Sequence, residues 1–188
     1  EAETGGLSSW ITGNKPFTAT HWKAADGFFQ DMVFENPRDN SLNFNYDTDM
    51  KTALAKTSRS LDAVNPDLRP LQRRGGKLIL YHGWSDPDIS PLNTINYYNQ
   101  VQATVGSSTA EFLRLFMVPG MNHCGGGPGP NHFDGVTALE EWVEDGVAPE
   151  KIIAFHTTEG EIDRTRPLCP YPQVAVYSGK GSTNDAAN

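Results

Sequence analysis

The chain has 188 residues, of which 37% are hydrophobic, so it is long enough for one domain with an apolar core and part of another. Its formal net charge of −8 disfavours a polyanionic partner such as nucleic acid. No apolar stretch approaches the roughly 20 residues that a membrane span requires. Composition therefore disfavours a nucleic-acid-binding chain and a membrane-spanning one, and it predicts a soluble globular protein.

Residues 1–62 show no sustained helical or strand period, although they are rich in aromatic residues that we expect to be buried. A short helix is expected over Asp26–Phe34 with Phe29, Met32 and Val33 facing inward, and another over Asp47–Ser58, opened by an acidic first turn. We interpret residues 1–62 as the end of a lid or cap region. The alternative is a compact small α domain that is complete in itself. The aromatic residues of this segment are Trp10, Phe17, Trp22, Phe28, Phe29, Phe34, Phe44 and Tyr46.

Residues 63–188 carry the pattern of an α/β fold. Ala63–Gly76 is a connector, because its prolines prevent a continuous helix. Lys77–His82 and Phe112–Val118 are apolar runs that predict buried strands, and the period over Thr94–Val105 predicts a helix between them. If the two strands are parallel neighbours joined by a right-handed crossover, the loops that follow them emerge at one edge of the sheet.

The remaining elements continue the alternation of helices and strands. An amphipathic helix is expected to begin after Asp134, a candidate N-cap, and to end at Gly146. Lys151–His156 predicts a further strand. Pro170 then begins an extended arm that carries Val174, Val176 and Tyr177.

The two loops after the predicted strands offer a carboxylate, Asp86, and an imidazole, His123. A carboxylate that orients a histidine, which in turn takes the proton of a nucleophile, is two thirds of a Ser-His-Asp triad. The order Asp86 before His123 also fits the α/β-hydrolase order of nucleophile, acid and histidine. None of the upstream serines has a glycine on both sides at the spacing of a G-x-S-x-G elbow, so we infer that the chain lacks its nucleophile. These serines are Ser8, Ser9, Ser41, Ser58 and Ser60.

Several neighbouring residues could take other roles. Asp88 competes with Asp86 as the acid, but it could instead cap the turn before Ile89. We expect His82 to be packed or hydrogen-bonded at the strand end rather than catalytic. A metal cluster of His82, Asp86, Asp88 and His123 could also activate water, but this spacing fits no familiar ligand motif, so no metal site is predicted.

Other polar and glycine-rich features have simpler interpretations. His132 and His156 are expected at the surface or in loops. Gly125–Gly127 is followed by no lysine at Walker spacing, so these glycines are expected to let the loop bend close to the site rather than to cradle a phosphate.

Four segments resemble the tannase and feruloyl esterase family of α/β-hydrolases. The His-Cys dipeptide in a glycine-rich loop is the most specific of these features. Together the segments span most of residues 75–181. They are Gly75–Asp86, Val118–Gly127, Trp142–Glu144 with Gly146 and Ala148–Pro149, and Arg166–Pro172.

The resemblance implies a secreted serine esterase that hydrolyses esters of aromatic acids, such as galloyl or feruloyl esters, through an acyl-enzyme and without a cofactor. It implies that Asp86 is the acid and His123 the base. The nucleophile in this family lies in an upstream Cys-Ser pair, which this chain lacks, so we expect residues 63–188 to be the C-terminal part of the hydrolase domain. The other expected partner is then the N-terminal portion of the same enzyme.

The resemblance also implies the pairing of the two cysteines. Cys124 is expected to bond a cysteine beside the nucleophile, and Cys169 a cysteine a few residues past Asn188. Both partners lie outside this chain, so Cys124 and Cys169 are not expected to bond to each other. A structural calcium ion occurs in the lid of some members, but no EF-hand-like loop is present here.

A second hypothesis belongs to a different class of function. The chain could be a non-catalytic binding or assembly module derived from the hydrolase fold. The presence of another polypeptide that carries a serine nucleophile in an intact sample would decide between the two hypotheses.

Overall fold

The computed structural model describes residues 6–36 and 41–188, and the chain divides into two compact units, Glu1–Val64 and Asn65–Asn188. Among the described residues, no helix is both long and apolar enough to cross a membrane. The role of the first unit as part of a lid stays a prediction. This unit is helical, and its regular elements are α1 (Thr20–Gly27), α2 (Asp49–Leu61) and the shorter turns Ser8–Thr12, Phe28–Val33 and Ser41–Asn43.

The helix expected over Asp26–Phe34 is only partly present. It is divided between the end of α1 and a π-helical turn, Phe28–Val33, in which the amide of Phe34 bonds the carbonyl of Phe29 at 2.8 Å. Val33 is buried as predicted, but Met32 is exposed. Bonds between residues five apart change the rotation per residue, so the spacing expected for an α-helix no longer places these side chains on one face.

Aromatic rings gather in the first unit, but not all of them are buried. Phe44 lies 4.6 Å from Phe29 and 5.0 Å from Tyr46, measured between ring centroids. Tyr46 and Phe17 are nevertheless exposed, so the expectation of general burial is wrong for these two rings. A unit of this size has little interior in which to bury large side chains.

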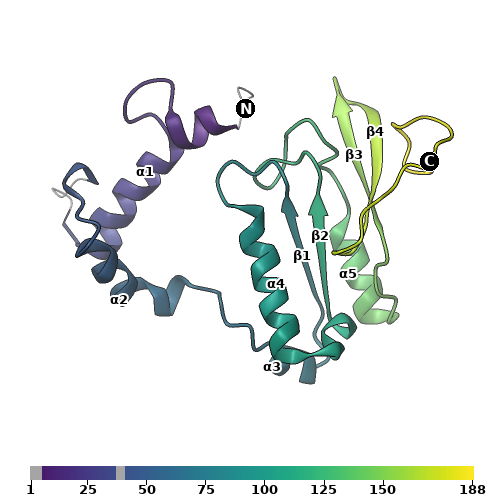
Figure 1. The fold of residues 1–188 in the computed structure, drawn as a ribbon, viewed down its shortest axis with the longest axis horizontal. Coiled ribbons are helices and arrows are strands. Elements are labelled where there is room, and N and C mark those ends of the chain that lie inside the picture. The colour runs from purple at the N-terminus through teal and green to yellow at the C-terminus, as the bar shows by residue number, and fades with distance from the viewer. Residues whose placement is uncertain (1–5, 37–40) are drawn as a thin grey trace. The chain divides into compact units, whose positions relative to one another are not determined.

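The second unit has the predicted α/β arrangement. Strands β1 and β2 are parallel, in a register that runs from Leu78 opposite Leu113 to Gly83 opposite Val118, and their arrowheads lie at the same end in Figure 1. Both predicted strands and the helix between them are confirmed. The elements of this unit are α3 (Arg69–Arg73), β1 (Leu78–Gly83), α4 (Pro91–Val105), β2 (Leu113–Val118), α5 (Gly135–Glu144), β3 (Ile152–Thr158) and β4 (Glu161–Leu168).

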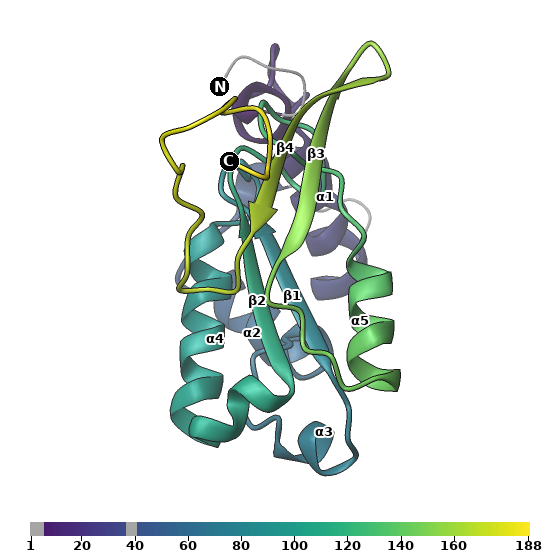
Figure 2. The same cartoon turned by 90° about the vertical axis from the view of Figure 1, so that its right-hand side faces the viewer.

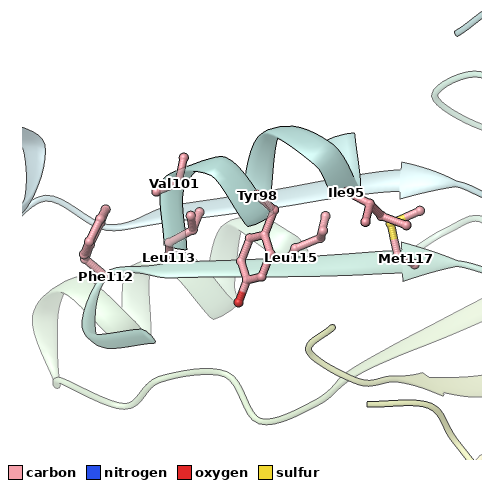
Figure 3. Packing of buried hydrophobic residues seen from close by; sticks show 7 residues of the cluster. All are labelled: Ile95, Tyr98, Val101, Phe112, Leu113, Leu115 and Met117. Carbon is pink, nitrogen blue, oxygen red and sulfur yellow. The ribbon is translucent and has the colours of Figure 1, made fainter. Parts of the chain in front are cut away.

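Strand β2 is buried on both faces, and its alternating side chains build two apolar clusters. Leu113, Leu115 and Met117 face helix α4, as Figure 3 shows. Phe116 and Val118 belong to the second cluster, with residues of β3, β4 and α5. Helices α4 and α5 thus lie on either side of the strand pair (Figure 2). The two clusters fix the position of β2, and therefore of the loop that leaves its carboxyl end.

The C-terminal third of the chain contains one predicted strand and one that was not predicted. β3 is confirmed, and it pairs antiparallel with β4 through a two-residue turn in which Glu159 and Gly160 have positive φ values of 54° and 87°. The arm after β4 is attached to β2, because the amide of Tyr171 bonds the carbonyl of Leu115 at 2.7 Å. Val176, farther along the arm, is exposed.

The start of α5 agrees with the sequence. Asp134 is the N-cap, and its carboxylate accepts a hydrogen bond from the amide of Thr137 at 2.9 Å. This bond satisfies one of the amides that have no partner inside the helix. The predicted N-cap is therefore confirmed.

Candidate active site

The loops that follow β1 and β2 are joined to each other by backbone hydrogen bonds. The amide of Trp84 bonds the carbonyl of Val118 at 2.9 Å, and the amide of Ser85 bonds the carbonyl of Met121 at 3.0 Å. This close approach requires glycine at position 83, because a Cβ there would collide with the Met121 carbonyl. The ends of the two strands are thus held in contact before any side chain is considered.

The second loop bends back on itself through its glycines. The amide of Asn122 bonds the carbonyl of Gly126 at 3.1 Å. Gly127 has a φ of 89°, and a Cβ at this position would collide with the carbonyl of Gly120. The glycine run therefore has a conformational role in the loop that carries His123, which agrees with the sequence interpretation.

Asp86 and His123 lie together where the two loops meet. Nδ1 of His123 is 2.9 Å from Oδ2 of Asp86, which is a hydrogen-bond distance. The Asp86 side chain is 4% exposed and that of His123 is 31% exposed. Because the carboxylate faces Nδ1, that nitrogen carries the hydrogen in the neutral ring. The second ring nitrogen, Nε2, is then the basic atom, and it lies on the edge of the ring away from Asp86.

The other oxygen of Asp86 is fixed by its own loop. Oδ1 accepts hydrogen bonds from the amides of Asp88 at 2.8 Å and Ile89 at 3.0 Å. Burial tends to raise the pKa of Asp86, but the bonds from Ile89, His123 and Asp88 and the charge of His123 together outweigh burial, so the pKa lies below its ordinary value. Asp86 is therefore ionised at neutral pH and oriented by three donors.

This lowered pKa predicts how stability depends on pH. The folded chain binds fewer protons than the unfolded chain in the interval between the two pKa values of Asp86. The contribution of Asp86 to the free energy of unfolding is therefore fully present above the unfolded value of about 4, and it is lost as the pH falls through the folded value. Asp86→Asn should lower the free energy of unfolding clearly at about pH 6 and much less near pH 3.

Urea unfolding of both chains across this range measures the difference. Asp145→Asn is the control, because Asp145 is exposed at the end of α5. A destabilisation by Asp86→Asn that is the same at every pH would contradict the assignment.

Asp88, the alternative to Asp86, and the neighbouring His82 lie in different positions. Oδ2 of Asp88 is 3.6 Å from Nδ1 of His123, farther than Asp86, and the backbone of Asp88 supports Asp86. His82 is hydrogen-bonded at the end of β1, as expected, since Nδ1 lies 2.7 Å from the hydroxyl of Thr94. No local pattern in the sequence indicates Thr94 as that partner.

The alternative of a metal site at these side chains can be compared with the structure. Within residues 6–36 and 41–188, no group of three or more His, Cys, Asp or Glu side chains is arranged to hold a metal ion. The bonds that His82, Asp86 and His123 make point them at one another and at their own loops, so they act as partners rather than as convergent ligands.

His132 and His156, in the same unit, make other contacts. His132 is exposed, and its ring stacks on Phe155 with centroids 5.3 Å apart. His156 is not in a loop: it lies in β3 and contacts Asp163 at 2.6 Å from Nδ1 to Oδ1.

The two cysteines are not bonded to each other. Cys124 is exposed and follows His123 directly, with a positive φ of 61°. Cys169 is partly buried at the start of the arm. The pairing of each cysteine with a partner outside residues 1–188 stays a prediction.

A cavity of about 560 Å³ lies beside the two loops. Trp84 and Gly120 contribute to its wall, and Arg164, Arg166 and Tyr171 also line it. Asp86 and His123 are not among its lining residues. The cavity therefore adjoins the pair without containing it.

Comparisons with known proteins agree on one family. The family model described as tannase and feruloyl esterase matches residues 1–188. A mono(2-hydroxyethyl) terephthalate hydrolase of Piscinibacter sakaiensis is 47% identical over 78% of this chain and 26% of its own length. An uncharacterised esterase of Xanthomonas campestris is 38% identical, over 100% of this chain and 40% of its own length.

A solved structure gives the same result. Feruloyl esterase B from Aspergillus oryzae superposes with a TM-score of 0.80 and 30% identity, over 96% of this chain and 38% of that one. The chain thus spans less than half the length of these relatives. Its fold is a partial α/β fold shared with known esterases.

Proposed function

The chain belongs to the tannase and feruloyl esterase family, and on that premise we propose that it supplies the acid and the base of a serine esterase whose nucleophile lies outside these 188 residues. The observation that carries the proposal is the contact of 2.9 Å between Asp86 and His123. It joins two loops that leave adjacent parallel strands at the same edge, where open α/β sheets place their sites.

The proposed reaction follows from the roles of the two side chains. Nε2 of His123 takes the proton of a serine hydroxyl as the serine oxygen attacks the ester carbonyl, and Asp86 stabilises the imidazolium that forms. The imidazolium then protonates the departing alcohol, which leaves an acyl-enzyme. A water molecule, deprotonated by the same nitrogen, releases the carboxylic acid and restores the serine. No cofactor enters this sequence of steps.

The proposed substrates are esters of hydroxylated aromatic acids, of the galloyl or feruloyl type. The family description supports this class. The relative with 47% identity is named for a hydroxyethyl ester of terephthalate, which is also an ester of an aromatic acid. Resemblance to the family further supports secretion of the enzyme.

The cysteines fit a role in holding the catalytic loops. We place the partners of Cys124 and Cys169 outside residues 1–188, with Cys124 joined to a cysteine beside the nucleophile. Such a bond would fix His123 relative to the serine, and displacements of about 1 Å can cost about 100-fold in rate. Peptide mapping without reduction tests this pairing, and a peptide that links Cys124 to Cys169 would refute it.

The experiment for the proposed function compares two purified proteins, the 188-residue chain and the longer polypeptide that carries it, called here the full-length enzyme. Both are assayed with feruloyl, galloyl and p-nitrophenyl esters. The full-length enzyme should show saturable hydrolysis. The chain alone should show none above the weak residual catalysis that remains without a nucleophile.

Two outcomes would contradict the proposal. Saturable activity of the chain alone, abolished by a serine-directed phosphonate, would place the nucleophile inside it. A full-length protein that hydrolyses none of these esters would favour the binding or assembly module.

A further inference from the structure

A second imidazole touches the carboxylate of Asp86 from the side of β1. Nε2 of His82 lies 3.1 Å from Oδ2 of Asp86 and 3.2 Å from the carbonyl oxygen of Ile89. The His82 side chain is 11% exposed. His82 therefore contacts both ends of the turn from Asp86 to Ile89. Within this turn, the amides of Asp88 and Ile89 donate to Oδ1 of Asp86.

The partners of His82 indicate which of its ring nitrogens carries the hydrogen. The carbonyl of Ile89 can only accept a hydrogen bond, so Nε2 of His82 must carry a hydrogen. Nδ1 lies 2.7 Å from the hydroxyl of Thr94 in the first turns of α4. A hydroxyl can donate to a bare nitrogen, and this is the only hydrogen bond in which the Thr94 hydroxyl takes part within the described residues. In the neutral ring, Nε2 is then the donor to Ile89 and Nδ1 the acceptor from Thr94.

We propose that His82 is a positioning residue for the pair formed by Asp86 and His123, held as the neutral Nε2–H form by Thr94. Its hydrogen bond to the carbonyl of Ile89 ties the turn that carries Asp86 to helix α4, and its Nε2 lies 3.1 Å from the same carboxylate oxygen that faces His123. With Oδ1 held by two amides and Oδ2 placed between two imidazoles, Asp86 has one orientation. The expected effect of His82 on kcat rests on the proposed function. Its expected effect on which nitrogen of His123 carries the hydrogen does not.

The charged groups around this arrangement are few. Asp86 and Asp88 come from the loop after β1, His123 comes from the loop after β2, and Thr94 from α4 is uncharged. A change in the charge or orientation of Asp86 therefore acts on His123 first. Loss of His82 should accordingly alter which nitrogen of His123 carries the hydrogen.

The first experiment uses nitrogen-15 NMR of the histidine rings in the 188-residue chain, which requires no catalysis. The parent chain should show His82 as Nε2–H and His123 as Nδ1–H when both are neutral. His82→Leu removes the donor, and the fraction of His123 in the Nδ1–H form should fall. His82→Gln keeps an N–H group near the position of Nε2 and should retain most of that fraction. Thr94→Val removes the hydroxyl at nearly constant volume, and it should reduce the fraction of His82 in the Nε2–H form.

The second experiment measures the full-length enzyme. His82→Leu should lower kcat about tenfold to hundredfold with KM within about twofold, and it should shift the acid limb of the profile of kcat/KM against pH, which reports the essential base of the free enzyme. His82→Gln should restore kcat to within about fivefold of the parent, because it restores the donor.

Each outcome bears on the proposal. His82→Leu could lower the melting temperature without changing the tautomer of His123 or the pH profile. That result would give His82 a packing role only, and it would overturn the proposal. If His82→Leu does not fold, Thr94→Val decides, and a His82 that stays fully Nε2–H in that variant would overturn the role of Thr94. If the parent enzyme hydrolyses no ester, the proposed function fails, while the NMR result still decides the positioning of His123.

Discussion

Replacing His123 by glutamine in the full-length enzyme is expected to lower kcat for ester hydrolysis by about a millionfold, as loss of the base does in serine hydrolases. Glutamine has a similar volume but cannot accept the proton of the nucleophile. The attacking oxygen would then remain a neutral hydroxyl, and the leaving alcohol would have no acid to protonate it. KM should change little if the imidazole contributes mainly to the transition state.

His132→Gln is the matched control, because that ring is exposed and stacks on Phe155. Its kcat should stay within about threefold of the parent value, as expected for a side chain outside the triad. Retention of more than about a tenth of the parent kcat by His123→Gln would remove His123 from the role of base.

Asp86→Asn is expected to lower kcat about ten-thousandfold, since a similar change in a triad leaves the geometry intact but selects the wrong form of the histidine. The asparagine oxygen can still accept from the amides of Asp88 and Ile89. Its NH₂ group would then face Nδ1 of His123, so that Nδ1 would be the acceptor and Nε2 would carry the hydrogen. A His123 in that form cannot take the proton of the nucleophile.

Asp88→Asn distinguishes the role of Asp88 from that of Asp86. Asp88 supports Asp86 through its backbone amide, which the substitution keeps, so kcat should fall less than about tenfold. Steady-state assays of both variants, with circular dichroism to verify folding, measure the difference. A larger loss for Asp88→Asn than for Asp86→Asn would reverse the assignment of the acid.

The strands and loops that carry the site could be predicted from the sequence because local residue patterns mark them. The runs that form β1 and β2 are rich in apolar residues, as strands of parallel sheets are, although β1 is only partly buried and its Tyr81 is exposed. The two loops then follow from the common edge of a parallel pair. Asp134 was recognisable as an N-cap because its carboxylate precedes an amphipathic helix.

Other features depended on contacts that no local pattern encodes. β4 has the sequence Glu-Ile-Asp-Arg-Thr-Arg-Pro-Leu, and its Ile162 is exposed, so hydrophobic alternation is weak. Its pairing is selected by the tight turn at Glu159–Gly160 and by β3. The prediction that Met32 is buried is wrong because it assumes an α-helix, and no residue pattern indicates the π-helical turn.

The residues that orient Asp86 were only partly predictable. An aspartate before proline in a turn is a signal for side-chain bonds to amides two and three residues later, and the structure has these bonds. The contact between His82 and Thr94 depends instead on how α4 packs against the end of β1. That arrangement is a result of tertiary packing and has no signature in the spacing of the residues.

Covalent labelling of the full-length enzyme with a fluorophosphonate, followed by peptide mapping without reduction, tests the central claim most directly. The proposal predicts one labelled serine, in a peptide outside residues 1–188, and no labelling when His123 is replaced by glutamine, because the base that activates the serine is absent. A label on any serine within residues 1–188, or full labelling of His123→Gln, would contradict the assignment of this chain as the bearer of the acid and base alone.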